Sequence, residues 1–309
     1  MKKKEKTPLP FKQYLEEELR RTKGKYYPVQ VSVLKRIRNM FVPIEKLHPN
    51  PADEFCDPAI GPNYEIISRY ETDYRRAMEM GEDGFIQSGI REAIMVQKAK
   101  PDGYLIMNGH HRWAAAYRAG LPKVKIRVIN VTQPKDIERM LMQSKSDRRV
   151  TLDLDEVVFG KEGEHALEKP FRFPLNRIYK SRVRQGVPAL LSTLNDQGYD
   201  VWLYTSSLLY SEEYIRYYFR HWNVRLAGIV NDARHKGVPE RDPDGKLKKL
   251  AETRYRSTTH IDSGLVLRTF SGSREIEEYP LSGSEDTWSR EVMEVFEKIR
   301  HKDLVKPGP

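Results

Sequence analysis

Two aspartates follow an apolar run near the middle of the 309-residue chain. The run 150–152, Val-Thr-Leu, leads into Asp153 and, two places on, Asp155. This pattern is typical of a buried strand that delivers carboxylates to a crevice at its carboxyl end. Residues two apart on a strand point the same way, so the two acids can share one site. Because close carboxylates need a cation or a proton between them, the pattern predicts a divalent-cation site or a nucleophile beside a general acid/base.

The stretch Asp153-Leu154-Asp155-Glu156-Val157 resembles the first motif of the haloacid dehalogenase (HAD) phosphohydrolases, Asp-x-Asp-x-Thr/Val. The resemblance implies that Asp153 attacks phosphorus and forms an aspartyl-phosphate. It also implies that Asp155 protonates the leaving group and then activates water.

The other motifs of that family have counterparts in chain order. Residues 200–207 form an expected strand that ends in hydroxyls, and Thr205 matches the residue that holds the transferring phosphoryl group. Residues 258–262 form another, ending in Asp262, which would bind Mg²⁺ together with Asp153 and Asp155. Lys246 is the candidate for the third-motif lysine, with Lys248 and Lys249 as competitors.

The interval between the first two motifs is short. From Asp153 to Thr205 the chain has room for a loop and one helix, but not for a large cap. Residues 182–187 resemble the Arg-Pro-Gly lead-in of capless HAD phosphatases, with Gln185 in place of the proline, while Ser263 and Gly264 stand where the fourth motif often has a second acid. The resemblance covers roughly residues 149–300 and implies a HAD-like Rossmannoid domain with a parallel sheet and little or no cap.

A second chemistry-bearing stretch is Asn108-Gly109-His110-His111-Arg112. It follows a predicted β-hairpin, residues 93–96 and 104–107 joined by Pro-Asp-Gly, and opens a predicted helix that ends at Gly120. Backbone N–H groups and basic side chains at a helix start favour an anion, and an arginine can bind phosphate through two hydrogen bonds. The stretch therefore predicts a phosphate- or nucleotide-binding loop.

Residues 40–129 resemble the ParB N-terminal/sulfiredoxin superfamily, through boxes at 42–51 and 89–96 and through the Gly-His-His-Arg loop. The loop is most similar to that of the free-serine kinases, which implies that it holds the phosphates of ATP, ADP or CTP. His110 replaces the sulfiredoxin cysteine, so sulfinic acid repair is not expected. The kinases' catalytic glutamate has no clean counterpart, although Asp53 and Glu54 lie near its place, and the helix-turn-helix of partition proteins is missing.

The composition of the chain limits the classes of ligand and partner that we expect it to bind. The net charge of +10 favours anionic ligands such as phosphorylated metabolites, nucleotides or nucleic acid. Cys56 is the one cysteine, which excludes an internal disulfide and is more typical of a packed side chain than of a nucleophile. We see no signal peptide and no apolar run of membrane-spanning length, so we expect a cytoplasmic protein without a membrane partner.

These patterns together predict a two-domain α/β protein. We expect an N-terminal helix and strand extension over residues 1–39, with a helix from Pro8 to about Arg21 and a strand over 29–34. A ParB/sulfiredoxin-like α+β domain is expected over 40–147, ending in a helix over 134–144. A HAD-like domain over 148–302 and a flexible tail over 303–309 would follow. The leading hypothesis is a Mg²⁺-dependent phosphatase acting on a phosphorylated small molecule or nucleotide. The alternatives are a bifunctional or kinase-type enzyme that phosphorylates a serine-like hydroxyl compound, and a ParB-like DNA-binding or regulatory protein. Nucleic acid is the less favoured partner.

Overall fold

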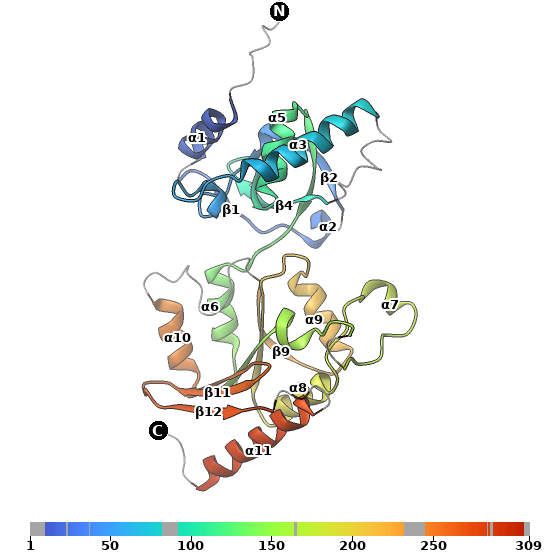
Figure 1. Cartoon of the computed structure of the whole chain (residues 1–309). Helices are drawn as coiled ribbons and strands as arrows, with labels where there is room; N and C mark the ends of the chain where they lie inside the picture. Colours follow the sequence, from blue (N-terminus) through green and yellow to red (C-terminus); the bar gives the residue numbers. More distant parts are fainter. Residues whose placement is uncertain are drawn as a thin grey trace, which may run out of the picture. The chain divides into compact units, whose positions relative to one another are not determined.

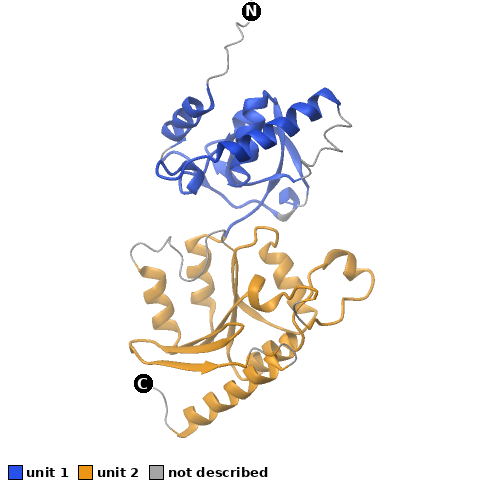
Figure 2. Cartoon of the chain, in the orientation of Figure 1, with its two compact units in different colours: residues 1–131 blue, residues 132–309 orange. Residues whose placement is uncertain are grey.

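The computed structural model describes residues 10–22, 24–36, 38–81, 92–163, 166–231, 245–282, 284 and 287–305. These residues form a mixed α/β protein with two separate β-sheets (Figure 1). The chain divides into two compact units, residues 1–131 and 132–309 (Figure 2). No helix among the described residues is both long and apolar enough to cross a membrane.

The first unit is built on a mixed sheet of order β2-β6-β4-β5-β3, with β1 paired to β4. Its strands are β1 Tyr27–Pro28, β2 Met40–Pro43, β3 Leu47–His48, β4 Ile94–Lys100, β5 Tyr104–Asn108 and β6 Lys123–Val128. Its helices are α1 Phe11–Thr22, α2 Val33–Arg36, α3 Tyr64–Glu79 and α5 His110–Ala119, with 3₁₀ turns η1 Ile44–Lys46 and η2 Glu54–Cys56. The predicted hairpin and the helix after it are confirmed as β4, β5 and α5.

Helix α5 lies at the centre of this unit. Trp113 and the three alanines after it are fully buried, because small side chains let the helix pack closely on α3. Burial raises the pKa of the Cys56 thiol to about 12, as expected for a packed cysteine rather than a nucleophile.

The predicted strand over residues 29–34 is wrong. The chain pairs with β4 at Tyr27–Pro28, adds one backbone hydrogen bond from Val29 to Lys98 at 2.8 Å, and turns into the short helix α2 at Val33. Between them, the side-chain amide of Asn130 accepts from the backbone N–H of Val31 and donates to its carbonyl. A side chain therefore satisfies the backbone groups that a strand ladder would have used.

The second unit has a sheet of order β12-β11-β10-β7-β8-β9, in which β10, β7, β8 and β9 are parallel and β11 and β12 antiparallel. The strands are β7 Arg148–Asp153, β8 Asp200–Thr205, β9 Leu226–Asn231, β10 Ser257–Ile261, β11 Leu265–Phe270 and β12 Ile276–Pro280. The helices are α6 Pro134–Gln143, α7 Leu175–Ile178, α8 Val187–Asp196, α9 Glu212–Arg220, α10 Lys246–Arg254 and α11 Trp288–Val305, with a π-helical turn η3 Leu154–Val158. The strand that leads into Asp153 and the strands predicted at 200–207 and 258–262 are confirmed as β7, β8 and β10, although β8 ends at Thr205 and β10 at Ile261. The one helix for which the sequence leaves room between Asp153 and Thr205 is confirmed as α8.

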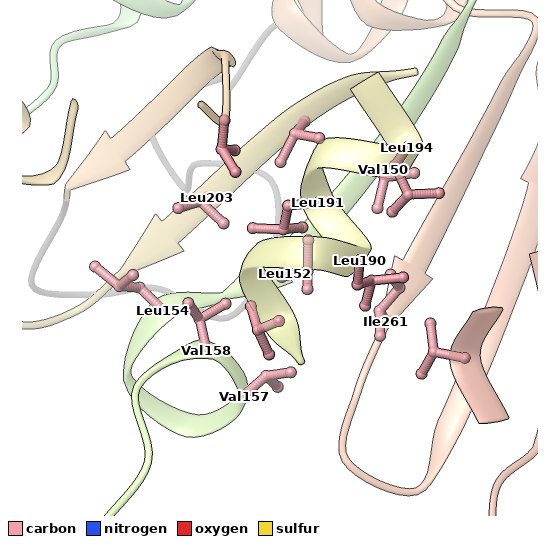
Figure 3. Close-up of a cluster of buried hydrophobic side chains, with 14 of the residues drawn as sticks. Val150, Leu152, Leu154, Val157, Val158, Leu190, Leu191, Leu194, Leu203 and Ile261 are labelled. Atoms are coloured by element: carbon pink, nitrogen blue, oxygen red, sulfur yellow. The ribbon is translucent and has the colours of Figure 1, made fainter. Parts of the chain in front are cut away.

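Alternating side chains of the central strands face two different helical layers. Val150, Leu152 and Leu203 join the larger core with α8, as Figure 3 shows. Trp202, which directly precedes Leu203 on β8, points to the other face, where it packs with α6 and α10. The unit is therefore a three-layer arrangement with helices on both faces of a largely parallel sheet.

The division between the units falls earlier than the sequence predicts. The expected boundary is residue 147, whereas the compact units separate after Val131. The reason is the apolar side of α6: Ile137, Met140 and Leu141 pack against Trp202 and Leu247 of the second unit. The helix expected at the end of the first domain thus forms part of the second core.

Candidate functional site

The carboxyl ends of the parallel strands of the second unit gather polar side chains at one edge of the sheet. The register of β10, β7, β8 and β9 sets the ends of these strands side by side. Along this edge the order is Asp262, Asp153, Thr205 and Asn231. Ligand sites of open parallel sheets lie at this edge, so it is the first place to look for chemistry.

Asp153 is the last residue of β7 and caps the π-helical turn η3. Its Oδ1 accepts hydrogen bonds from the backbone N–H groups of Asp155 and Glu156, both at 2.7 Å. Both bonds are made by Oδ1, which fixes the carboxylate and leaves Oδ2 for other chemistry. Burial raises the pKa of Asp153 above its ordinary value, although the two backbone donors oppose the shift.

Asp155 is turned toward the end of β8. Its Oδ2 accepts from the Thr205 hydroxyl at 2.7 Å and from the backbone N–H groups of Ser206 at 3.0 Å and Ser207 at 3.2 Å. The sequence-based reason for pairing the two acids needs correction, because β7 ends at Asp153 and Asp155 lies in η3. The π-helical turn, rather than strand alternation, brings both acids to the same edge; such turns are frequent at functional sites.

Lys246 pairs with an acid other than the two aspartates. It is the first residue of α10, its side chain is 71% exposed, and its ammonium pairs with Glu138 of α6 at 3.0 Å. The competitor Lys248 lies 4.0 Å from Glu252 on its own helix. α10 packs on α6, and this packing gives Lys246 its acidic partner. The structure therefore does not support Lys246 as the lysine of this site.

The three predicted metal ligands do not form one cluster. In the part of the chain that is described, no three His, Cys, Asp or Glu side chains gather closely enough to hold a metal ion. Asp155 points to Thr205, which leaves Asp153 and Asp262 at neighbouring strand ends. Two carboxylates still fit Mg²⁺, which commonly keeps several waters and binds through one or two carboxylates plus substrate phosphate.

A cavity of about 490 Å³ opens beside Asp155. Its walls come from residues 159–162, 167 and 180–182 and from the loop after β8, and three of its lining side chains are basic: Lys161, Lys180 and Arg182. In the sequence, Arg182 belongs only to a motif resemblance, and the two lysines carry no signal of a site. Nothing in their spacing showed that the segment folds back beside the strand ends.

In the first unit, Gly109 begins α5 with φ of 101°, in the left-handed region that favours glycine. His110 is buried, and its Nε2 accepts from the backbone N–H of Asn50 at 3.2 Å while its Nδ1 lies 3.5 Å from Asp53. Asp53, expected near the place of the kinase glutamate, thus lies beside the loop.

His111 lies in the first turn of α5 and also uses Nε2 as an acceptor. It takes the backbone N–H of Asn63 at 3.2 Å, and burial lowers its pKa. These contacts hold residues 50–63 against the start of the helix. Both imidazoles therefore position the loop around the predicted anion site rather than presenting Nε2 to a ligand.

Arg112 requires a correction. Its side chain is nearly buried, and its guanidinium donates to the carbonyls of Glu92 at 2.9 Å and Ala93 at 3.4 Å and to Asn108 Oδ1 at 3.2 Å. Arg112 thus ties α5 to the residues before β4 instead of reaching into solvent for phosphate. Residues 89–91 of the second predicted box lie outside the described residues.

Comparison with known proteins gives one family match. Residues 64–145 match the ParB N-terminal domain. This ParB-like region includes the loop 108–112, whereas the first predicted box lies before it.

Relatives and solved structures give partial matches. An uncharacterized protein of Methanocaldococcus jannaschii is 27% identical over 128 residues, which span 39% of this chain and 41% of that protein. The Caulobacter crescentus ParB structure with CTP-gamma-S is 25% identical over 36% of this chain and 56% of that one, with a TM-score of 0.24. A free serine kinase in complex with AMP is 13% identical over 82% of this chain and 96% of that one, with a TM-score of 0.21.

Replacing Arg112 tests its structural role. Arg112→Met leaves the carbonyls of Glu92 and Ala93 without their charged donor, so we expect the free energy of unfolding to fall by about 2–4 kcal/mol in urea titrations. Arg75→Met is the control: this side chain is 56% exposed and pairs with Glu71, so the loss should stay below about 1 kcal/mol. Equal losses in the two variants would contradict the assignment.

Asp153 should make folding less favourable as pH rises. Its folded pKa lies above its unfolded value, so stability is lost as pH rises from about 3.9 through the raised folded pKa. We expect Asp153→Asn, which has no charge to bury, to melt at a higher Tm than the native protein near pH 7. The gap should close as pH falls through that window. Asp196→Asn, at the exposed end of α8, controls for the loss of one charge, and a gap independent of pH would contradict the burial argument.

Proposed function

We propose that residues 132–309 form a HAD-like phosphohydrolase that cleaves phosphate monoesters through an aspartyl-phosphate on Asp153. The observation that carries the proposal is the pair of anchored acids: Asp153, held through Oδ1, and Asp155, held by Thr205 at 2.7 Å. The two acids have different partners, as a nucleophile and an acid/base require. The motif resemblance and the parallel strand order support the same reading.

In the proposed first step, Asp153 Oδ2 attacks phosphorus while the bond from phosphorus to the leaving oxygen breaks. Asp155 gives that oxygen its proton. The hydrogen bonds to Asp155 from the end of β8 all use Oδ2, so Oδ1 is the oxygen that carries the proton. In the second step Asp155 takes a proton from water, whose oxygen attacks phosphorus while the bond from phosphorus to Asp153 Oδ2 breaks. Inorganic phosphate leaves, and the Asp153 carboxylate is restored.

Charge on the transferring phosphoryl group needs donors and cations. The Thr205 hydroxyl and the N–H groups of Ser206 and Ser207 donate to Asp155 Oδ2 in this structure, so they would have to exchange that carboxylate for a phosphate oxygen to stabilise the phosphoryl group. Asp153 and Asp262 would hold Mg²⁺, which when bound would neutralise phosphate charge. Because Lys246 pairs with Glu138, we assign the cationic role among described residues to Lys161, which lines the cavity beside Asp155.

The ParB-like match favours a second proposal for the first unit, namely that it binds a nucleotide such as ATP or CTP at the start of α5. Gly109 lets the strand turn sharply into the helix, whose first N–H groups can face a phosphate. Asp53, 3.5 Å from His110, stands where an acid could act on a hydroxyl substrate. The proposal extends to a kinase reaction at this place. Release of ADP or AMP on adding serine would test that reaction.

Substitutions of the two aspartates should cause different kinds of activity loss. Asp153→Asn removes the nucleophile, so turnover of every substrate should be lost. Asp155→Asn removes the acid/base, so alkyl phosphates should lose roughly 10²–10⁴-fold in kcat, and p-nitrophenyl phosphate, whose leaving group needs no proton, much less. Steady-state assays with Mg²⁺ measure both. Equal losses on both substrates would reject the acid role, and an inactive native protein on a broad monoester panel would reject the phosphatase.

Adding a negative charge at the loop tests nucleotide binding by the first unit. Asn108→Asp keeps an acceptor for Arg112 but sets a carboxylate beside the proposed phosphates. We expect the affinity for ATP or CTP, measured by calorimetry, to fall about tenfold or more, which is about 1.4 kcal/mol. Asn223→Asp adds the same charge in the second unit and should change nothing. Binding that is absent in the native protein, or equal in all three, would contradict the proposal.

A further inference from the structure

Basic side chains outnumber acidic ones in the cavity beside Asp155. Lys161, Lys180 and Arg182 line it together with two carboxylates, Asp155 and Glu162. With a volume of about 490 Å³, it can take a group of the substrate beyond the phosphoryl group at the strand ends. What fills it must therefore be a part of the substrate that prefers cations.

Arg182 is held in a way that suits a second anion. Its Nε donates to the carbonyl of Glu168 at 3.0 Å, which fixes the plane of the guanidinium. Its Nη1 pairs with Glu162 at 3.1 Å, but that carboxylate is largely exposed. An exposed ion pair contributes little, so a phosphate group, which can accept two hydrogen bonds from the guanidinium, can replace the carboxylate at this position.

The remaining wall of the cavity adds neutral hydrogen-bonding groups. The Tyr210 hydroxyl lies 2.8 Å from the Ser181 hydroxyl, and both residues line the cavity with Ser206 and Ser207. Hydroxyls mixed with basic side chains are typical of sites for phosphate oxygens. An apolar substrate group would shield these polar groups from water without offering new hydrogen bonds, which is costly.

We propose that the substrate carries a second phosphate group, bound by Lys180 and Arg182 while the first phosphate meets Asp153. This inference rests on the proposed phosphohydrolase activity and names its substrate class. The second group is either a further monoester, as in a small bisphosphate, or the next phosphodiester of an oligonucleotide whose end is phosphorylated. Both present negatively charged phosphate oxygens to the cavity.

Matched substrate pairs test the proposal. We compare kcat/KM for fructose 1,6-bisphosphate with that for fructose 6-phosphate, and for 5′-phosphorylated dithymidylate with that for thymidine 5′-monophosphate. In at least one pair the substrate with two phosphates should be favoured about tenfold or more, and the pair that shows it identifies the source. No preference in either pair overturns the proposal.

Substitutions that change the charge of the cavity should shift the preference for the two-phosphate substrate in opposite directions. Lys180→Gln with Arg182→Gln should abolish the preference while leaving the single-phosphate substrates unchanged. Glu162→Gln, which removes the competing carboxylate, should strengthen it several-fold. Lys169→Gln, an exposed lysine on the same segment that does not line the cavity, is the control. Equal losses on both members of a pair would overturn the second-phosphate site.

Binding to an Asp153→Asn protein separates this inference from the activity. Calorimetry should give tighter binding of the two-phosphate member of the favoured pair, and the Lys180 and Arg182 changes should remove the difference. If the native protein hydrolyses nothing but this difference is found, the site stands and the phosphatase proposal fails. If hydrolysis is found without the difference, the phosphatase stands and the second-phosphate site fails.

Discussion

Parallel pairing of β7 with both β8 and β10 is the constraint on which the second unit depends. It sets the ends of three strands at one edge, and the residues found there are Asp153, Thr205 and Asp262. The π-helical turn after β7 then adds Asp155 to the same edge, hydrogen-bonded to the end of β8. Apolar packing on both faces of the sheet fixes these positions. The polar residues at the edge are therefore positioned by buried apolar side chains elsewhere on the same strands.

The fold was predictable where patterns were local. Apolar runs ending in acids or hydroxyls predicted β7, β8 and β10, and Pro-Asp-Gly between two short strands predicted the β4–β5 hairpin. The strand over 29–34 failed, because a side chain far along the sequence, Asn130, satisfies the backbone of Val31. No pattern within the segment itself can show such a contact.

The site was predictable in its acids and less so in its cations. Asp153 and Thr205 stand where a strand must end, whereas a long basic side chain can reach many partners, so spacing alone cannot assign it. Lys246 pairs with a neighbouring helix, and Arg112 turns inward to carbonyl groups. The cations beside Asp155 come from a segment whose return to the strand ends depends on tertiary structure.

Helix α6 falls within the ParB-like family match but packs in the core of the second unit. The ParB-like match runs through it to residue 145, but its apolar side chains pack in the core of the second unit. Cutting the chain where the family match ends would therefore strip a helix from the second sheet and expose Trp202 and Leu247 to water. Any attempt to study the halves separately has to divide them after Val131, where the polypeptide passes from one hydrophobic core to the other.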